Sequence, residues 1–139
     1  MRIALLVPLV LTLSPSLSLA QDAANGEKVF AQCRACHQVG PTAKNTVGPV
    51  LNGLFGRKAG TVEGYNYSAA NKNSGLTWDE ATFTDYIKDP RAKIPGTKMI
   101  YAGLKDEKRI ADLIAYLKQF DAAGQKAASA AETLRLAGS

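Results

Sequence analysis

The string CRACH at residues 33–37 limits what this chain can become more than any other feature. It contains both cysteines and the single histidine of the 139-residue sequence. Two thiols and an imidazole this close together are typical of three kinds of centre: a disulfide redox pair, part of a zinc site, or an attachment point for haem. Each kind of centre requires something different from the rest of the chain.

The first twenty residues have the anatomy of a secretory signal peptide. Arg2 gives a short positive start, an apolar run extends from Ile3 to Leu13, and Ser18-Leu19-Ala20 supplies the small residues of a cleavage site. A retained membrane anchor is the alternative, but the apolar run is shorter than the ~20 residues that a membrane-spanning helix needs. We therefore expect residues 1–20 to be removed and residues 21–139 to be exported as a soluble product.

The exported part is long enough for one compact domain and too short for two. The whole chain carries a formal net charge of +5, of which Arg2 contributes one unit. A modest positive excess favours solubility or attraction to an acidic partner. Lysines outnumber arginines and few aromatic residues lie near them, so we expect no binding to nucleic acid.

The hydrophobic pattern predicts an all-α domain with three main helices, one or two short helices and no convincing strand. The strongest helix has an apolar stripe at helical spacing, formed by Ile110, Leu113, Ile114 and Leu117. The main helices are expected from Asp22 to about Cys33, from Thr77 to about Lys88, and over residues 105–120, with a short helix over Ser68–Ser74.

Two helix starts have recognisable caps. Asp22 is a good N-cap for the first helix. Thr77 is followed three residues later by Glu80, which predicts a capping box at the start of the middle helix.

Residues 39–64 are rich in glycine and proline and follow neither a helical nor a strand period, so we expect an ordered loop. A loop of this length is unusual in a compact domain. Three helices also supply a thin hydrophobic core. A large buried prosthetic group would account for both observations, whereas residues 121–139, which are rich in alanine, are expected to form a frayed helix or a loose tail.

The three interpretations of Cys33, Cys36 and His37 can now be compared. A thioredoxin-like redox pair needs a βαβ unit beside the motif, and the pattern predicts none. A structural zinc site needs four ligands, and the chain has no further cysteine or histidine. Covalent haem needs nothing more, because both thiols can add to the porphyrin vinyl groups and the adjacent histidine can bind the iron.

Met99 is the only methionine outside the signal peptide. It lies in a segment punctuated by proline and glycine, where irregular backbone could bring the side chain over a flat ligand. Histidine on one face of the iron and a thioether on the other raise the reduction potential and leave no open coordination position. This ligand pair favours electron transfer over catalysis, so we expect the protein not to be an enzyme.

Several stretches together resemble class I cytochrome c. They are CRACH, GPVLNGLFGRKAG, YNYSAAN, LTW, IPGTKMIYAG and IADLIAYLKQF, and they extend from about Gly26 to Phe120. The closest resemblance is to the small periplasmic cytochromes c of photosynthetic purple bacteria, which are similar to mitochondrial cytochrome c. It implies a haem domain over residues 21–120, with short helices and long loops wrapped around one covalently bound haem c.

The resemblance also implies roles for individual residues. Pro49 would accept a hydrogen bond from His37, and Gly26 would allow the first and last helices to cross closely. Polar groups around the haem propionates and near the methionine sulfur would complete the haem pocket: Arg57, Tyr67, Asn71 and Trp78 around the propionates, and Tyr86 and Thr97 beside Met99.

The function implied is that of a periplasmic one-electron carrier between larger redox complexes. The expected donor is a membrane cytochrome bc complex, and the expected acceptor is a photosynthetic reaction centre or a cytochrome oxidase. Docking would be transient, between a monomeric carrier and acidic surfaces, through Lys28, Lys93, Lys98 and Lys105. The alternative is a haem c protein whose sixth ligand is labile, acting as a gas sensor or weak peroxidase.

Overall fold

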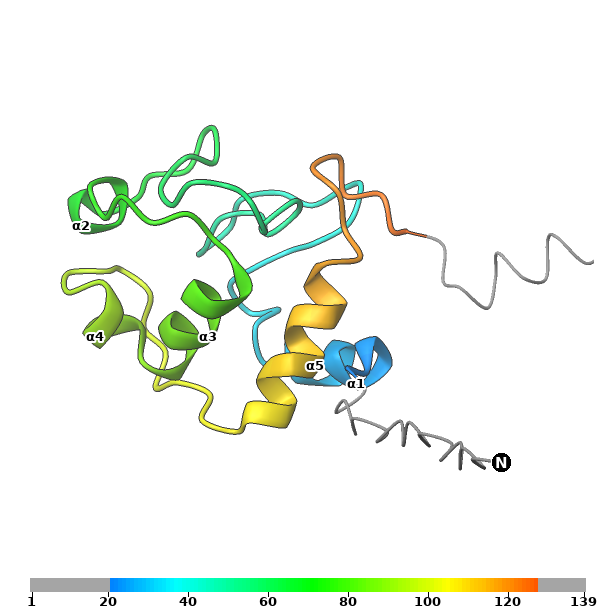
Figure 1. The fold of residues 1–139 in the computed structure, drawn as a ribbon. Coiled ribbons are helices and arrows are strands. Elements are labelled where there is room, and N and C mark those ends of the chain that lie inside the picture. The colour runs from blue at the N-terminus through cyan, green and yellow to red at the C-terminus, as the bar shows by residue number, and fades with distance from the viewer. Residues whose placement is uncertain (1–20, 128–139) are drawn as a thin grey trace, which may run out of the picture.

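The computed structural model describes residues 21–127 and is helical throughout its regular parts (Figure 1). Within these residues there is no strand, only isolated bridges between Lys58 and Thr77 and between Phe120 and Lys126. The all-α prediction is confirmed. The expected signal peptide and residues 128–139 lie outside the described residues. The helices follow the order α1 (Ala23–Phe30), α2 (Ala69–Lys72), α3 (Glu80–Lys88), α4 (Pro90–Lys93) and α5 (Glu107–Leu117).

The first and last helices, α1 and α5, pack against each other (Figure 1), and Gly26 lies where they cross. A Cβ atom placed on Gly26 would lie 1.9 Å from the backbone oxygen of Asp112 in α5, so only glycine permits this approach. Beside the crossing, the rings of Phe30 and Tyr116 pack with their centroids 5.4 Å apart. Asp22 caps α1 by accepting hydrogen bonds from the amides of Ala24 and Asn25, as predicted.

The start of α3 differs from the predicted capping box. Asp79, not Thr77, caps the helix, and its carboxylate accepts a hydrogen bond from the Thr82 amide at 2.7 Å. Thr77 is held in extended backbone by its bridge to Lys58. This pairing between distant segments moves the helix start beyond Thr77.

The short helices have local causes. The short helix predicted near Ser68 is α2, and Ser68 caps it by accepting a hydrogen bond from the Asn71 amide. The sequence pattern did not predict α4, although its start has two ordinary signals: Asp89 as the N-cap and Pro90 at the first helical position. Since Asp89 also ends α3, the chain changes direction between two consecutive helices there.

The segment 39–64 is an ordered loop without helix or strand, as predicted. Asparagine side chains, rather than a backbone ladder, hold this loop in place. Asn52 accepts from the amide and donates to the carbonyl of Gly40, both at 2.8 Å. Asn45 accepts from the Val50 amide and donates to the Glu63 carbonyl. These side chains fix the loop against its own backbone.

The predicted stripe of α5 is buried, and it packs with side chains from α1, α3 and the loops. None of the helices within residues 21–127 has the length and hydropathy of a membrane span. The apolar core side chains that are at most 3% exposed include Phe30, Ile94, Ile110, Leu113, Ile114 and Leu117.

Candidate haem site

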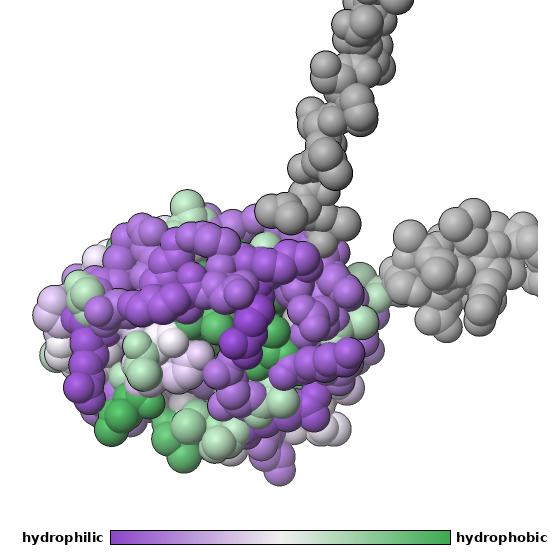
Figure 2. Space-filling view, turned by 90° about the horizontal axis from the view of Figure 1, so that it is seen from below, coloured by the Kyte–Doolittle hydropathy of each residue, from purple (hydrophilic) through white to green (hydrophobic). Residues whose placement is uncertain are grey.

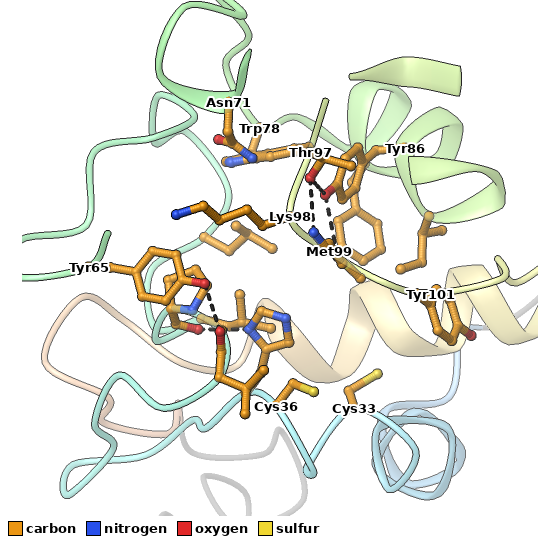
Figure 3. Close-up of a pocket in the computed structure, with 18 of the residues that line it drawn as sticks. Cys33, Cys36, Tyr65, Asn71, Trp78, Tyr86, Thr97, Lys98, Met99 and Tyr101 are labelled. Carbon is orange, nitrogen blue, oxygen red and sulfur yellow. Dashed lines mark hydrogen bonds between the residues drawn. The ribbon is translucent and has the colours of Figure 1, made fainter. Parts of the chain in front are cut away.

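One cavity gathers the residues expected to bind a cofactor (Figure 3). Apolar side chains from α1, α3 and α5 form much of its wall, including Phe30, Phe83 and Leu113. Every residue predicted for cofactor or iron binding also lines it: Cys33, Cys36, His37, Pro49, Arg57, Tyr67, Asn71, Trp78, Tyr86, Thr97 and Met99.

The two cysteines reach the cavity because the chain continues in helical turns after α1. The amides of Cys36 and His37 both donate to the carbonyl of Cys33, at 3.0 and 2.9 Å. Both thiols are free and half-buried. Burial, with a smaller effect from Cys36, raises the pKa of the Cys33 thiol to about 11. This neutral, apolar setting differs from that of a redox-active cysteine, whose pKa is lowered.

The imidazole of His37 is fixed in one tautomer. Its Nδ1 lies 2.8 Å from the carbonyl oxygen of Pro49, which can only accept, so Nδ1 carries the proton and Nε2 keeps its lone pair. Burial lowers the pKa of His37, against the opposing effect of this hydrogen bond. A Cβ atom on Gly48 would lie 2.3 Å from Cε1 of the ring. The local backbone therefore leaves the imidazole one position and a free metal-binding nitrogen.

Across the cavity from the cysteines, Met99 is held by a chain of hydroxyl groups (Figure 3). Tyr86 donates a hydrogen bond to the Met99 sulfur at 3.3 Å. Thr97 lies 3.2 Å from the Tyr86 hydroxyl and accepts a hydrogen bond from the Met99 amide. The indole of Trp78 packs edge-on against the Tyr86 ring, with centroids 5.0 Å apart. Burial raises the pKa of Tyr86, so the phenol stays a donor at neutral pH.

One part of the cavity wall is polar. The Nε of Arg57 and the Oδ1 of Asn71 are buried and have no hydrogen-bond partner among the described residues. The other guanidinium nitrogens of Arg57 donate to the carbonyls of Asn52 and Val50. Buried polar atoms are rarely left without a partner, so this wall is built to meet polar groups of a ligand.

Tyr65 and Gln32 also line this cavity, and neither was predicted from the sequence. The Tyr65 ring packs edge-on against Tyr67, with centroids 4.7 Å apart, and its hydroxyl donates to the Val47 carbonyl at 2.7 Å. Tyr101 also lines the cavity and donates to Gln32 across 69 positions of sequence. The spacing of the two tyrosines in YNYSAAN was the available signal for Tyr65.

The lysines expected to dock partners are exposed, and several also make contacts within the chain. Lys93 pairs with Asp85, while Lys98 and Lys105 donate to backbone carbonyls. Of the four, only Lys98 lines the cavity; Lys28 lies in the last turn of α1. Two apolar side chains at the cavity are well exposed, Val47 and Ile100, and Figure 2 shows one face of the molecule where apolar surface (green) lies among polar residues (purple).

The donor set fits a haem and no bare metal ion. Two neutral thiols, an oriented imidazole, a thioether and unpaired polar atoms line one largely apolar cavity. Within residues 21–127, no group of three or more His, Cys, Asp or Glu side chains could hold a metal ion. The fold and the site together define a small all-α protein built around a covalent haem.

Comparison with known proteins identifies the family. Residues 23–121 match the family model for cytochrome c. Cytochrome c2 of Blastochloris viridis is 66% identical over 117 residues, which cover 84% of this chain and 92% of that protein. The structure of cytochrome c2 from Rhodospirillum centenum superimposes with a TM-score of 0.69 at 44% identity, covering 72% of this chain and 98% of that one.

A further solved structure, cytochrome cH from Methylobacterium extorquens, is 53% identical with a TM-score of 0.66, covering 70% of this chain and 97% of that one. The chain therefore belongs to the cytochrome c family and has the cytochrome c fold. Its cofactor is covalently bound haem c, and it functions in electron transport.

Proposed function

We propose that the mature chain is a periplasmic one-electron carrier whose haem iron is held between His37 and Met99. The observation that supports this most strongly is the hydrogen bond from Tyr86 to the Met99 sulfur, in the cavity that His37 also lines. A thioether positioned by a buried phenol, opposite the cysteines that precede the histidine, is what a second axial ligand requires.

Each side chain has a defined task in this proposal. Cys33 and Cys36 hold the porphyrin through two thioether bonds. His37 presents Nε2 to the iron, because Nδ1 is engaged by the Pro49 carbonyl. The bound haem supplies an iron centre that gains or loses one electron. Since the chain fills both axial positions, we expect neither substrate binding at the iron nor enzyme activity.

The polar wall has a separate task. Arg57, Tyr67, Asn71 and Trp78 line the part of the pocket that we assign to the haem propionates. Arg57 already donates to two backbone carbonyls from its Nη atoms, and its buried Nε is the guanidinium nitrogen that has no partner and could donate to a carboxylate. A buried carboxylate needs such donors, because its desolvation is costly when it is unpaired.

Partner docking would use positive charge and exposed apolar surface near the Met99 segment. Lys98 lies beside Met99, and the 87% exposed side chain of Ile100 follows it. With Lys28, Lys93 and Lys105, we expect transient docking to the acidic surfaces of a cytochrome bc complex and of a reaction centre or cytochrome oxidase. Association driven by charge is fast and is screened by salt, so electron-transfer rates with either partner should fall as ionic strength rises.

The axial ligands can be tested with one variant and its neighbour. Met99→Ala should remove the weak near-red absorption of the ferric protein, lower the reduction potential and allow carbon monoxide to bind the ferrous form. Ile100→Ala is the matched control, because it shortens an exposed side chain of the same loop. It should keep the band and the potential.

The two candidate functions give opposite results in this experiment. A Met99→Ala protein that keeps its near-red band and potential would rule out the sulfur as ligand. Rapid binding of carbon monoxide by the unmodified ferrous protein would favour the gas sensor or weak peroxidase over the carrier.

A further inference from the structure

The chain does not leave the domain when α5 ends. Residues Asp121–Ala127, which we call the 121–127 turn, fold back on the end of the helix. The Ala127 amide donates to the Gln119 carbonyl at 2.8 Å, and the Gly124 amide donates to the Asp121 carbonyl at 2.9 Å. The Asp121 carboxylate also accepts from the Gln125 amide at 2.8 Å. This segment is therefore a closed, hydrogen-bonded turn.

The 121–127 turn packs tightly on the loop that surrounds the haem cavity, and Figure 1 shows the two segments side by side (orange and cyan). A Cβ atom on Gly124 would lie 2.1 Å from the Gly40 carbonyl oxygen and 2.5 Å from the side-chain nitrogen of Asn52. A Cβ atom on Gly53 would lie 2.9 Å from the Cα atom of Ala122. The Gly53 amide donates to the carbonyl of Phe120, just before the turn.

The part of the loop under this turn is the part that holds Arg57. The carbonyl of Asn52 accepts from Nη1 of Arg57 at 2.8 Å, while the buried Asn52 side chain is fastened to both backbone groups of Gly40. Ala122 and Arg57 also share the lining of a surface hollow beside the haem cavity. A shift of the Asn52–Gly53 peptide would therefore move an acceptor of the guanidinium.

We propose that the 121–127 turn is a positioning element for Arg57. It fixes the Asn52–Gly53 peptide, and this peptide keeps the guanidinium oriented so that its unpaired Nε–H group can donate into the cofactor cavity. This inference rests on the proposed function of Arg57 as a partner of a haem propionate. Without the turn, the loop would loosen, and the positive charge would move away from the buried carboxylate and be hydrated.

The experiment is a double-mutant cycle on the reduction potential of the holoprotein. The first variant ends after Phe120, the second is Arg57→Gln, and the third combines them; a chain that ends after Ala127 is the control. Losing a nearby positive charge favours the oxidised state, so Arg57→Gln should lower the potential. The chain ending after Phe120 should lower it too, and the combined variant should lie close to Arg57→Gln alone, because both changes act through one group.

A second readout is exchange of the Arg57 Nε proton, measured by nuclear magnetic resonance, which should speed up at least tenfold in the chain ending after Phe120 and stay unchanged in the control. If the two potential shifts add fully, or the chain ending after Phe120 keeps its potential and exchange rate, the turn does not position Arg57. If Arg57→Gln itself leaves the potential unchanged, the propionate assignment fails instead. Should the short chain not retain haem, Gly124→Ala enters the same cycle, because it keeps the length and displaces the turn.

Discussion

Asp112 in α5 offers the sharpest test of how the helix crossing is stabilised. Its side chain is 0% exposed, which is unusual for a carboxylate. It accepts hydrogen bonds from the Asp22 amide at 2.9 Å, from Asn25 Nδ2 at 2.6 Å and from Lys108 Nζ at 2.5 Å. Two of these donors belong to the start of α1, so this carboxylate fastens the first helix to the last.

The contribution of the Asp112 carboxylate to stability can be worked out from its pKa. Burial acts to raise this pKa, but the hydrogen bonds from Lys108, Asp22 and Asn25 outweigh it and lower the pKa from an ordinary 3.8 to about 2. A shift of this size corresponds to roughly 2 kcal/mol of stability for the ionised group. Because the folded pKa is depressed, this stability is present above pH ~4 and is lost as pH falls through about 2.

The perturbation is Asp112→Asn, which keeps the shape and removes the charge. At pH 7 the free energy of unfolding should fall by about 2–4 kcal/mol, because three donors then face an amide that can accept from few of them. Urea unfolding followed by far-ultraviolet circular dichroism measures this change. Repeating it between pH 7 and pH 2 should show the difference between the two proteins shrinking below pH 4.

Glu107→Gln is the matched control, because Glu107 lies on the same helix as Asp112 and also pairs with a lysine, Lys88 of α3, but its side chain is 72% exposed. That change should reduce the free energy of unfolding by less than about 1 kcal/mol, as is usual for a surface ion pair. The reasoning would be refuted if Asp112→Asn reduced the free energy of unfolding no more than Glu107→Gln does. It would also be refuted if the reduction were equal at pH 7 and at pH 2.

Three further substitutions test separate parts of the molecule. Gly26→Ala should reduce the free energy of unfolding by about 3 kcal/mol, measured by urea titration, because its methyl group would overlap the backbone of α5. Tyr86→Phe removes the donor to the Met99 sulfur and should shift the reduction potential in voltammetry while urea unfolding changes little; an unchanged potential would contradict the tuning role. Gly48→Ala would push against the His37 ring and should lower the amount of covalent haem, measured as a pyridine haemochrome. A normal amount of covalent haem would show that the loop can move to accept the methyl group.

Much of the helical fold was predictable because its signals are local. Asp22 and Ser68 are caps within a turn of the amides they bind, and the stripe of α5 repeats within its own eleven residues. The prediction of a capping box at Thr77 was wrong because of a contact with a distant segment of the chain. The Trp78 amide donates to the Arg57 carbonyl, and this pairing holds the Thr77 region extended until Asp79 can cap the helix.

Asp112 is a stronger example of a position whose structure depends on residues distant in the sequence. By periodicity it is a polar residue beside an apolar stripe, and a solvated position would be the ordinary expectation. It is buried because α1 crosses α5 at Gly26, and because the donors of that helix start surround the carboxylate. A sequence pattern within one helix holds no information about the helix that will cover it.

The residues of the haem site also differ in whether a local sequence signal could predict them. The attachment motif could be predicted because its three groups lie within one helical turn, and Met99 because the mature chain contains no other methionine. The roles of partner residues such as Tyr86 and Arg57 came from resemblance to a family. Arg57 lies in a loop without a period, and Tyr86 has the pattern of an ordinary core aromatic of a helix. Tyr65 and Gln32 were missed because their contacts, with Val47 and Tyr101, join loop segments that no local pattern relates.

These observations assign different tasks to the helices and the loops. The crossing of α1 and α5 has its own contacts, with Gly26, the paired rings of Phe30 and Tyr116, and buried Asp112. It is thus a scaffold with contacts of its own, and its Phe30 and Leu113 side chains also form part of the cavity wall. The loops instead end in polar and sulfur groups directed at the cavity, so their order depends on side-chain bonds and on what fills that cavity. A thin helical core with long ordered loops is therefore a complete design only when the haem is counted as part of the core.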